Sequence, residues 1–187
     1  ILILGIMFSS GLSAIISILQ YTGSANALQS FVIWSMGSLG NVTEKNLLIM
    51  ALAILPGLFL AVLSVKGLNA MMLGEEYARS MGVNIMNIRI LVFVSTSILA
   101  GTVTAFCGPI GFVGIAVPHI TRFLIRRNTI QYLLPATLLM GINVMLVSDI
   151  ISQVPGNERI LPLNAVTSLM GIPIVIWVIF RNQKLNQ

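Results

Sequence analysis

Long apolar stretches separated by short polar segments dominate the hydrophobic pattern of the chain. A helix that spans a bilayer needs about 20 mostly apolar residues. Backbone groups in lipid must be paired within the segment, so helices are the expected form. The pattern therefore predicts an all-α membrane protein, a polytopic helical bundle, with six transmembrane helices. They are expected at about residues 1–20, 47–65, 88–106, 110–125, 131–151 and 162–180.

The composition supports a membrane protein. Of the 187 residues, 57% are hydrophobic and 8% are charged, whereas a soluble domain carries about 25% charged residues. The net charge of +5 does not indicate nucleic-acid binding, because the basic residues are scattered at the ends of the apolar stretches. The chain begins inside an apolar run at Ile1, without an initiator Met or a cleavage site. We therefore expect a single transmembrane domain over 1–187 whose N-terminal helices are missing.

Lysine and arginine are distributed unequally between the two sides that six consecutive helices define. One side holds eight basic residues: Lys66, Arg79, Arg89, Arg122, Arg126, Arg127, Arg181 and Lys184. The other side holds Lys45 and Arg159. Cytoplasmic loops carry an excess of Lys and Arg. The bias predicts that the loop 66–87 and the C-terminus are cytoplasmic, and that segments 21–46 and 152–161 are external.

The predicted cytoplasmic loop 66–87 contains helix-favouring residues punctuated by Gly74 and Gly82. We expect a first short helix that ends at Gly74 and a second opened by Glu75 and Glu76, since carboxylates suit a helix N-terminus. Exposed Leu and Met side chains would make an adaptable surface that docks a cytoplasmic partner. The alternative is a helical hairpin folded back on its own membrane domain.

Small residues recur every four positions in the first apolar stretch, at Gly5, Ser9, Ser13 and Ser17. This spacing places them on one face of a helix. Such a face favours close packing against a neighbouring helix. The alternative is that the face lines a polar translocation pathway, and a bundle interior allows both.

The stretch 107–122 is rich in residues that disturb a plain membrane helix. These are Gly108, Pro109, Gly111, Gly114 and Pro118, followed by His119, the only histidine. We expect a tight external turn at 107–109, close helix packing at the glycines and a break at Pro118. His119 has no Asp or Cys beside it, so it is expected to be a hydrogen-bonded structural residue rather than a metal ligand.

Two further features lie in the last two apolar stretches. Gly171 and Pro173 predict a kink or an interruption of the last helix, whose irregular backbone would be buried in protein or line a cavity. Asp149 is an acid beside a hydrophobic stretch, and an ionisable residue within a membrane is a candidate functional group. The alternative is that Asp149 lies at the water interface or caps a local turn.

The chain offers no hydrolytic constellation. It has one histidine and one cysteine, which excludes an internal disulfide and a cysteine-rich metal site, and no nucleophile–base set is apparent. No phosphate-binding Gly-Lys-Ser/Thr motif is present. We therefore expect no catalytic residue, no metal site and no cofactor bound by this chain.

Four motifs resemble those of one known family. Residues 108–122, GPIGFVGIAVPHITR, resemble the signature of the FecCD family, the permeases of ABC importers for iron-siderophores, haem and vitamin B12. Residues 34–39 resemble the family's W-x-x-G-S-L, and residues 73–82 resemble its L-G-x-x-x-A-x-x-L-G. Residues 161–173 resemble its closing L-P-x-G … G-x-P. The resemblance covers essentially the whole chain.

The resemblance implies a permease of ten helices that works as a dimer, with this chain as the C-terminal six. It implies that the loop 66–87 couples to an ABC ATPase subunit, which binds ATP and Mg²⁺. The residues at the coupling surface would be Leu73, Gly74, Glu75, Glu76, Ala78, Arg79 and Gly82. The other implied partners are an extracytoplasmic substrate-binding protein, a second permease subunit and the lipid bilayer of a bacterial cytoplasmic membrane, with no nucleic acid.

The chain departs from the family pattern at two positions. An Arg often follows the acid equivalent to Asp149 by four residues, and Gln153 stands there instead. That Arg can dock the binding protein, so Lys45 or Arg159 is expected to take its place. Asn164 stands where the L-P-x-G motif has glycine.

The implied function is ATP-driven import, most commonly of an iron-siderophore in this family. The pathway is expected along the Ser9 and Ser13 face and the last helix, with weak binding by a smooth wall. The alternative is an ion-coupled secondary transporter or channel, which would need intramembrane acids, and only Asp149 offers one. A membrane enzyme is a weaker alternative, for lack of a nucleophile.

Overall fold

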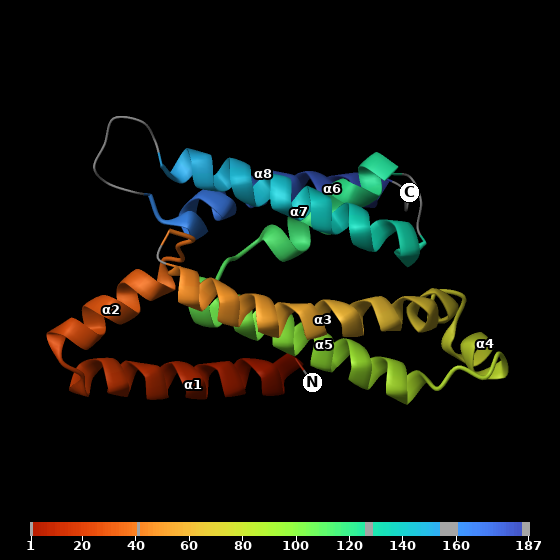
Figure 1. Cartoon of the computed structure of the whole chain (residues 1–187), viewed down its shortest axis with the longest axis horizontal. Coiled ribbons are helices and arrows are strands. Elements are labelled where there is room, and N and C mark those ends of the chain that lie inside the picture. The colour runs from red at the N-terminus through yellow and green to blue at the C-terminus, as the bar shows by residue number, and fades with distance from the viewer. Residues whose placement is uncertain (1, 41, 126–128, 154–160, 185–187) are drawn as a thin grey trace. The chain divides into compact units, whose positions relative to one another are not determined.

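The structure, a computed structural model, describes residues 2–40, 42–125, 129–153 and 161–184. Across these residues every regular element is an α-helix (Figure 1). The helices are α1 (Leu2–Thr22), α2 (Ala25–Ser35), α3 (Glu44–Met71), α4 (Glu75–Ser80), α5 (Ile85–Cys107), α6 (Val113–Ile125), α7 (Ile130–Ser152) and α8 (Leu163–Lys184). This confirms the prediction of an all-α protein.

The described helices differ in their capacity to cross a membrane. Within these residues, four helices (α1, α3, α5 and α7) are long and apolar enough to do so, and they match four of the six predicted spans. The other two predicted spans correspond to the shorter apolar helices Val113–Ile125 and Leu163–Ile176, the second of which lies within α8. A helix of 13 residues such as α6 is about 20 Å long, less than a hydrocarbon layer of about 30 Å.

The chain divides into two compact units, residues 1–35 and 36–187. In the first unit, α1 and α2 form a helical hairpin that turns at Gly23 (Figure 1). A groove of about 170 Å³ between them is lined by Ile16, Leu19, Gln20, Gly23, Ala27, Leu28 and Phe31. The segment after the first span is helical over α2, and this helix ends at Ser35, before Gly37.

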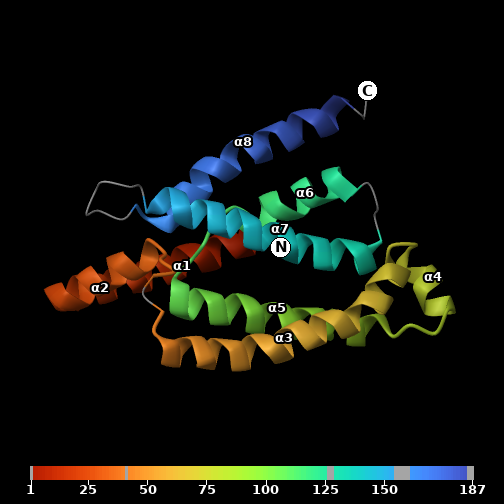
Figure 2. The same cartoon turned by 45° about the horizontal axis from the view of Figure 1, so that its top comes forward.

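Within the second unit, α3 and α5 run antiparallel as a closely packed pair (Figure 2). Asn84 starts α5 by accepting the Asn87 N–H through its side-chain oxygen at 3.1 Å. Gly57 on α3 faces Leu99, close enough that a Cβ on the glycine would lie 2.8 Å from Leu99 Cδ2. The absence of a side chain at this contact therefore permits the short interaxial approach.

The helices α6, α7 and α8 pack on one another in the same unit, with α6 in contact with both of the others (Figure 2). Their shared interior contains small and β-branched side chains: Ala116, Val117, Thr121, Ser148, Val166 and Thr167 are all buried. The buried hydroxyls are satisfied locally. Thr121 donates to the Val117 carbonyl at 2.8 Å, four residues back on its own helix.

Two predictions about helix boundaries were wrong, and one alternative of a third was excluded. The loop 66–87 does not begin with a separate short helix, because α3 continues as a single helix to Met71. Pro118 does not break α6. Pro173 does not interrupt α8 either, and the alternative of a kink at Pro173 stays a prediction. Proline removes one backbone donor but keeps a helical φ. Membrane helices tolerate this because neighbouring groups satisfy the freed carbonyl.

Candidate functional site

One end of the second unit carries the segment between α3 and α5, which includes the short helix α4. Two glycines set its path: Gly74 has φ 113° and Gly82 has φ 81°. Both angles lie in a region that other residues adopt only with strain. The prediction that Glu75 and Glu76 open a helix after Gly74 is confirmed, because α4 starts at Glu75.

The two faces of α4 differ sharply in exposure. Ala78 is 0% exposed and lies against the rest of the unit. Leu73, Tyr77 and Met81, spaced by four residues, are 68%, 55% and 59% exposed. Tyr77 lies on α4 itself, Leu73 precedes the turn at Gly74, and Met81 follows the last residue of the helix. We call Leu73, Tyr77 and Met81 the apolar stripe.

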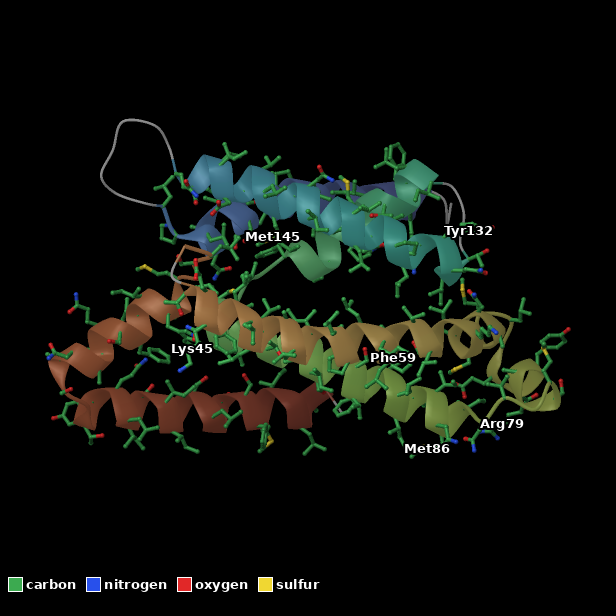
Figure 3. The ribbon with its side chains drawn as sticks, in the orientation of Figure 1. Lys45, Phe59, Arg79, Met86, Tyr132 and Met145 are labelled. Atoms are coloured by element: carbon green, nitrogen blue, oxygen red, sulfur yellow. The ribbon has the colours of Figure 1, made fainter. Side chains whose placement is uncertain are left out.

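Two polar contacts at this end of the unit connect helices, one between α4 and α5 and one between α3 and α7. An ion pair joins Glu75 on α4 to Arg89 on α5. Both side chains are about half exposed, so the pair contributes little free energy and mainly orients the two elements. Asn69, in the last turn of α3, accepts the Ile130 N–H at 2.8 Å and so satisfies a free donor at the start of α7. Arg79, Met86 and Tyr132 all lie toward this end of the unit (Figure 3).

The opposite end of the second unit brings together three segments that are distant in sequence. We call residues 36–38, 107–112 and 163–164 the junction. The Ser38 N–H donates to the Cys107 carbonyl at 2.9 Å. The Leu163 N–H donates to the Gly37 carbonyl at 3.3 Å. These bonds connect the segment between α2 and α3, the end of α5 and the start of α8.

Two further bonds at the junction come from Asn164. Its backbone N–H donates to the Met36 carbonyl at 3.1 Å, and its side-chain Oδ1 accepts the Gly111 N–H at 3.0 Å. Sequence reasoning noted Asn164 only as a departure from a glycine pattern. The bond across 53 residues could not be found from spacing, because it depends on how α6 and α8 pack.

The predicted turn between the third and fourth spans is present but longer than expected. Gly108 ends α5 with φ 78°, and α6 does not begin until Val113. Gly111 lies so close to α8 that a Cβ would stand 3.2 Å from Asn164 Oδ1. Gly114, by contrast, has no atom within 4 Å of the position a Cβ would take.

The small-residue face of the first span, Gly5, Ser9, Ser13 and Ser17, lies on α1 in the first unit and is exposed there. Ser17 Oγ donates to the Ser13 carbonyl at 2.9 Å, within its own helix. None of the four lines the groove between α1 and α2. Their assignment to packing or to a pathway stays a prediction.

The ionisable candidates in the apolar helices are bonded within their own helices. His119 Nδ1 is 2.8 Å from the Ile115 carbonyl, a bond four residues back in α6. Gln153 Nε2 donates to Asp149 Oδ2 at 2.7 Å. Within the part of the chain that the structure describes, no group of three or more His, Cys, Asp or Glu residues could hold a metal ion.

The residues predicted to dock a binding protein are only partly described. Lys45 is exposed in the first turn of α3, toward the same end of the unit as the junction. Arg159 lies outside the described residues, as do Arg126 and Arg127. Docking by Lys45 and Arg159 therefore stays a prediction.

Comparison with known proteins identifies the family. The model of the FecCD transport family matches residues 1–181. The chain belongs to the FecCD transport family. As a FecCD-family chain with four long apolar helices in its described part, it is a multi-pass membrane protein of a transport family.

The FecCD-family chain is similar to permeases with assigned cargo. It is 33% identical over 184 residues to the hemin transport system permease protein HmuU of Yersinia pestis, covering 98% of this chain and 55% of the relative. It is also 33% identical over 186 residues to the vitamin B12 import system permease protein BtuC of Serratia proteamaculans, covering 100% of this chain and 55% of that protein.

A solved structure shows the same fold. It is described as an inward-facing conformation of an ABC transporter of the metal-chelate type, and it superimposes with a TM-score of 0.84 at 32% identity. The match covers 96% of this chain and 58% of the solved one. This FecCD-family chain thus spans little more than half the length of the relatives it matches.

Proposed function

We propose that the chain forms part of the permease of an ABC importer, driven by ATP hydrolysis in a partner subunit. The observation that carries this proposal is the apolar stripe, exposed on α4 and on the residues that flank it, at one end of a FecCD-family bundle. Exposed apolar side chains on a soluble-facing element indicate a docking surface. The partner proposed for it is the ATPase subunit, which would bind ATP and Mg²⁺.

The contacts of α4 explain how such docking would reach the membrane helices. Buried Ala78 packs α4 against the unit, and the Glu75–Arg89 ion pair links α4 to α5. The hydrogen bond from Ile130 to Asn69 links the end of α3 to α7. A push on α4 therefore acts on α3, α5 and α7 together. Packed helices have discrete arrangements, so a small displacement at α4 can switch the bundle between two of them.

The roles proposed for the coupling residues follow from their exposure. Leu73, Tyr77 and Met81 make the contact, with Glu76 and Arg79 at its exposed polar margin. Gly74 and Gly82 shape the two turns, and their positive φ angles explain why glycine stands there. Ala78 supports α4 from below and does not itself meet the partner.

The junction end is the proposed external face. The basic residues Lys66, Arg79, Arg89 and Arg122 all lie toward the α4 end of the second unit, which supports a cytoplasmic α4 by the positive-inside rule. On that orientation an extracytoplasmic binding protein docks near Lys45 and segment 152–161. A second permease subunit completes the pathway, and the C-terminus is cytoplasmic.

The proposed cargo class is haem, cobalamin or a metal chelate such as an iron-siderophore. The support is the cargo named for the similar permeases, HmuU and BtuC, and for the metal-chelate type structure. These cargoes are large, and a large chelate passes more easily along a wall that binds weakly than through a cage of strong ligands. Uptake of labelled haem, cobalamin and ferric siderophore by the same cells would identify which one is carried.

Coupling is tested by removing the stripe. Tyr77→Ala combined with Met81→Ala should abolish co-purification with the ATPase subunit and reduce uptake at least tenfold, because the apolar contact is lost. Phe93→Ala is the matched control, since Phe93 is 73% exposed on α5 away from α4. Unchanged association and uptake in the double variant would remove α4 from the coupling role.

A further inference from the structure

The start of α6 contains a strained turn. Phe112 has φ 64°, and it is the one non-glycine residue with positive φ among the described residues. The Val113 N–H donates to the Gly111 carbonyl at 2.8 Å, which closes a three-residue turn with Phe112 at its centre. Such a conformation is costly for a bulky side chain and persists only where the surroundings enforce it.

The surroundings that enforce this turn come from α8. The Gly111 N–H, immediately before Phe112, is held by Asn164 Oδ1 at 3.0 Å. The Phe112 side chain lies against the backbone of Gly171, where a Cβ would stand 2.5 Å from Phe112 Cβ. One polar and one steric contact thus hold the two sides of the turn.

Asn164 is itself held in place. Its N–H donates to the Met36 carbonyl at 3.1 Å. Its carbonyl accepts the hydroxyls of Thr167 at 3.2 Å and Ser168 at 2.6 Å. The side-chain oxygen therefore projects from a well-ordered first turn of α8. Non-helical backbone near membrane depth needs protein partners for its polar groups, and Asn164 supplies the partner for Gly111.

We propose that Asn164 is a positioning residue that holds the strained turn at Phe112 closed and so sets the position of α6 against α8. The bond needs only an acceptor oxygen at position 164, and no described bond uses the amide nitrogen. Loss of that oxygen lets the junction open. Under the proposed function, on which this last step rests, the opening would disturb the external end of the pathway.

The single cysteine of the chain provides a readout that does not depend on transport. Cys107 is 4% exposed, and its carbonyl accepts the Ser38 N–H at the junction. A thiol this buried reacts with N-ethylmaleimide only when the structure opens locally, so the labelling rate reports the open population. The experiment uses the full chain in membranes.

Three variants separate the acceptor from the shape of the side chain. Asn164→Leu keeps the branched shape without the oxygen, and it should label Cys107 roughly fivefold faster, the change expected from losing one such hydrogen bond. Asn164→Asp keeps the acceptor and should label at close to the original rate. Asn143→Leu is the matched control, because the Asn143 amide donates only to the Leu139 carbonyl of its own helix. It should leave the rate unchanged.

The outcomes that would overturn the proposal are equally specific. Asn164→Leu labelling at the original rate would overturn it, and so would equal acceleration in the Asp and Leu variants. If the Leu variant does not accumulate in membranes, Phe112→Gly tests the same bond, because glycine relieves the strain at positive φ. The double variant Asn164→Leu with Phe112→Gly should then accumulate in membranes. Its Cys107 should be labelled at a rate within about twofold of that in Phe112→Gly alone. Failure of the double variant to accumulate would also overturn the proposal.

Uptake measured in the same variants keeps this proposal separate from the proposed function. Fast labelling in Asn164→Leu with reduced uptake supports both. Fast labelling in a protein that imports none of the tested cargoes, even with its original sequence, supports the positioning role and counts only against the transport assignment.

Discussion

A buried hydroxyl and a glycine carbonyl form a hydrogen bond between α3 and α5. Ser95 Oγ donates to the Gly57 carbonyl at 2.8 Å, across 38 residues of sequence. Ser95 is 2% exposed, so water does not compete for the bond. Most other described hydroxyls in the apolar helices bond to the preceding turn of their own helix, which fastens no two elements together. At the residue scale, Ser95 is therefore the polar link of this pair.

Ser95→Ala should lower the free energy of unfolding by about 1 kcal/mol, because an interhelical hydrogen bond in a membrane protein contributes on this scale. The measurement is SDS-induced unfolding of the protein in mixed micelles. Ser64→Ala is the matched control, since Ser64 is also 2% exposed but donates to Ala61 in its own helix. An equal loss of stability in the two variants would show that the Ser95 bond does not fasten the helices.

The residues of the candidate site were predicted unevenly, because only some of them have a local signature in the sequence. Gly74, Gly82 and the acidic pair Glu75 and Glu76 were found from the sequence, because turns and helix starts have local signatures. Ala78 came from a motif that could not say whether it is buried or exposed. Asn69 was missed, since a side chain that caps a helix 61 residues away has no local signature.

At the element scale, α4 is a six-residue helix that depends on contacts with the rest of the second unit. A helix this short has no stability of its own, because nucleation costs more than a single turn returns. Its described supports are buried Ala78, the Glu75–Arg89 pair and the turns at Gly74 and Gly82. The buried alanine is the support that a larger side chain would disturb directly.

Ala78→Leu should displace α4 without unfolding the membrane helices, because Leu does not fit a site with 0% exposure. Trypsin cleavage after Arg79, which lies on α4, should become at least tenfold faster, since proteolysis follows the population of the open segment. Ser80→Leu adds the same side chain at an exposed position and should leave the rate unchanged. Equal rates for Ala78→Leu and the original chain would contradict this seating of α4.

At the scale of the whole molecule, the second unit has two chemically different ends. The α4 end carries the cations Lys66, Arg79, Arg89 and Arg122 together with the acids Glu75 and Glu76, whereas the junction end carries Asp149, Glu44 and one described cation, Lys45. The count of Lys and Arg in the sequence and the topology of the described helices place the same basic residues at one end. The proposed orientation in the membrane rests on this asymmetry.

The orientation is tested with single cysteines in a Cys107→Ala background. Ser80→Cys, on α4, should react with a membrane-impermeant maleimide only in inside-out vesicles. Gln153→Cys, beyond the end of α7, should react in intact spheroplasts. Both positions are exposed, so a difference in labelling reports the side of the membrane. Reaction of Ser80→Cys in intact spheroplasts would reverse the assignment of both ends.

The sequence by itself determined that this is a membrane protein, which family it belongs to, and where its four long apolar helices lie. It also located the segment between α3 and α5 that contains α4. These follow from properties that are local or additive, namely apolar length, charge count and short motifs. The tertiary structure alone decided that Ala78 is buried while Tyr77 is exposed, that Ser95 joins Gly57, and that the Asn164 side chain accepts the Gly111 N–H in the turn before α6. In a membrane protein both lipid-facing and protein-facing positions are apolar, so hydrophobic periodicity cannot say which residues meet.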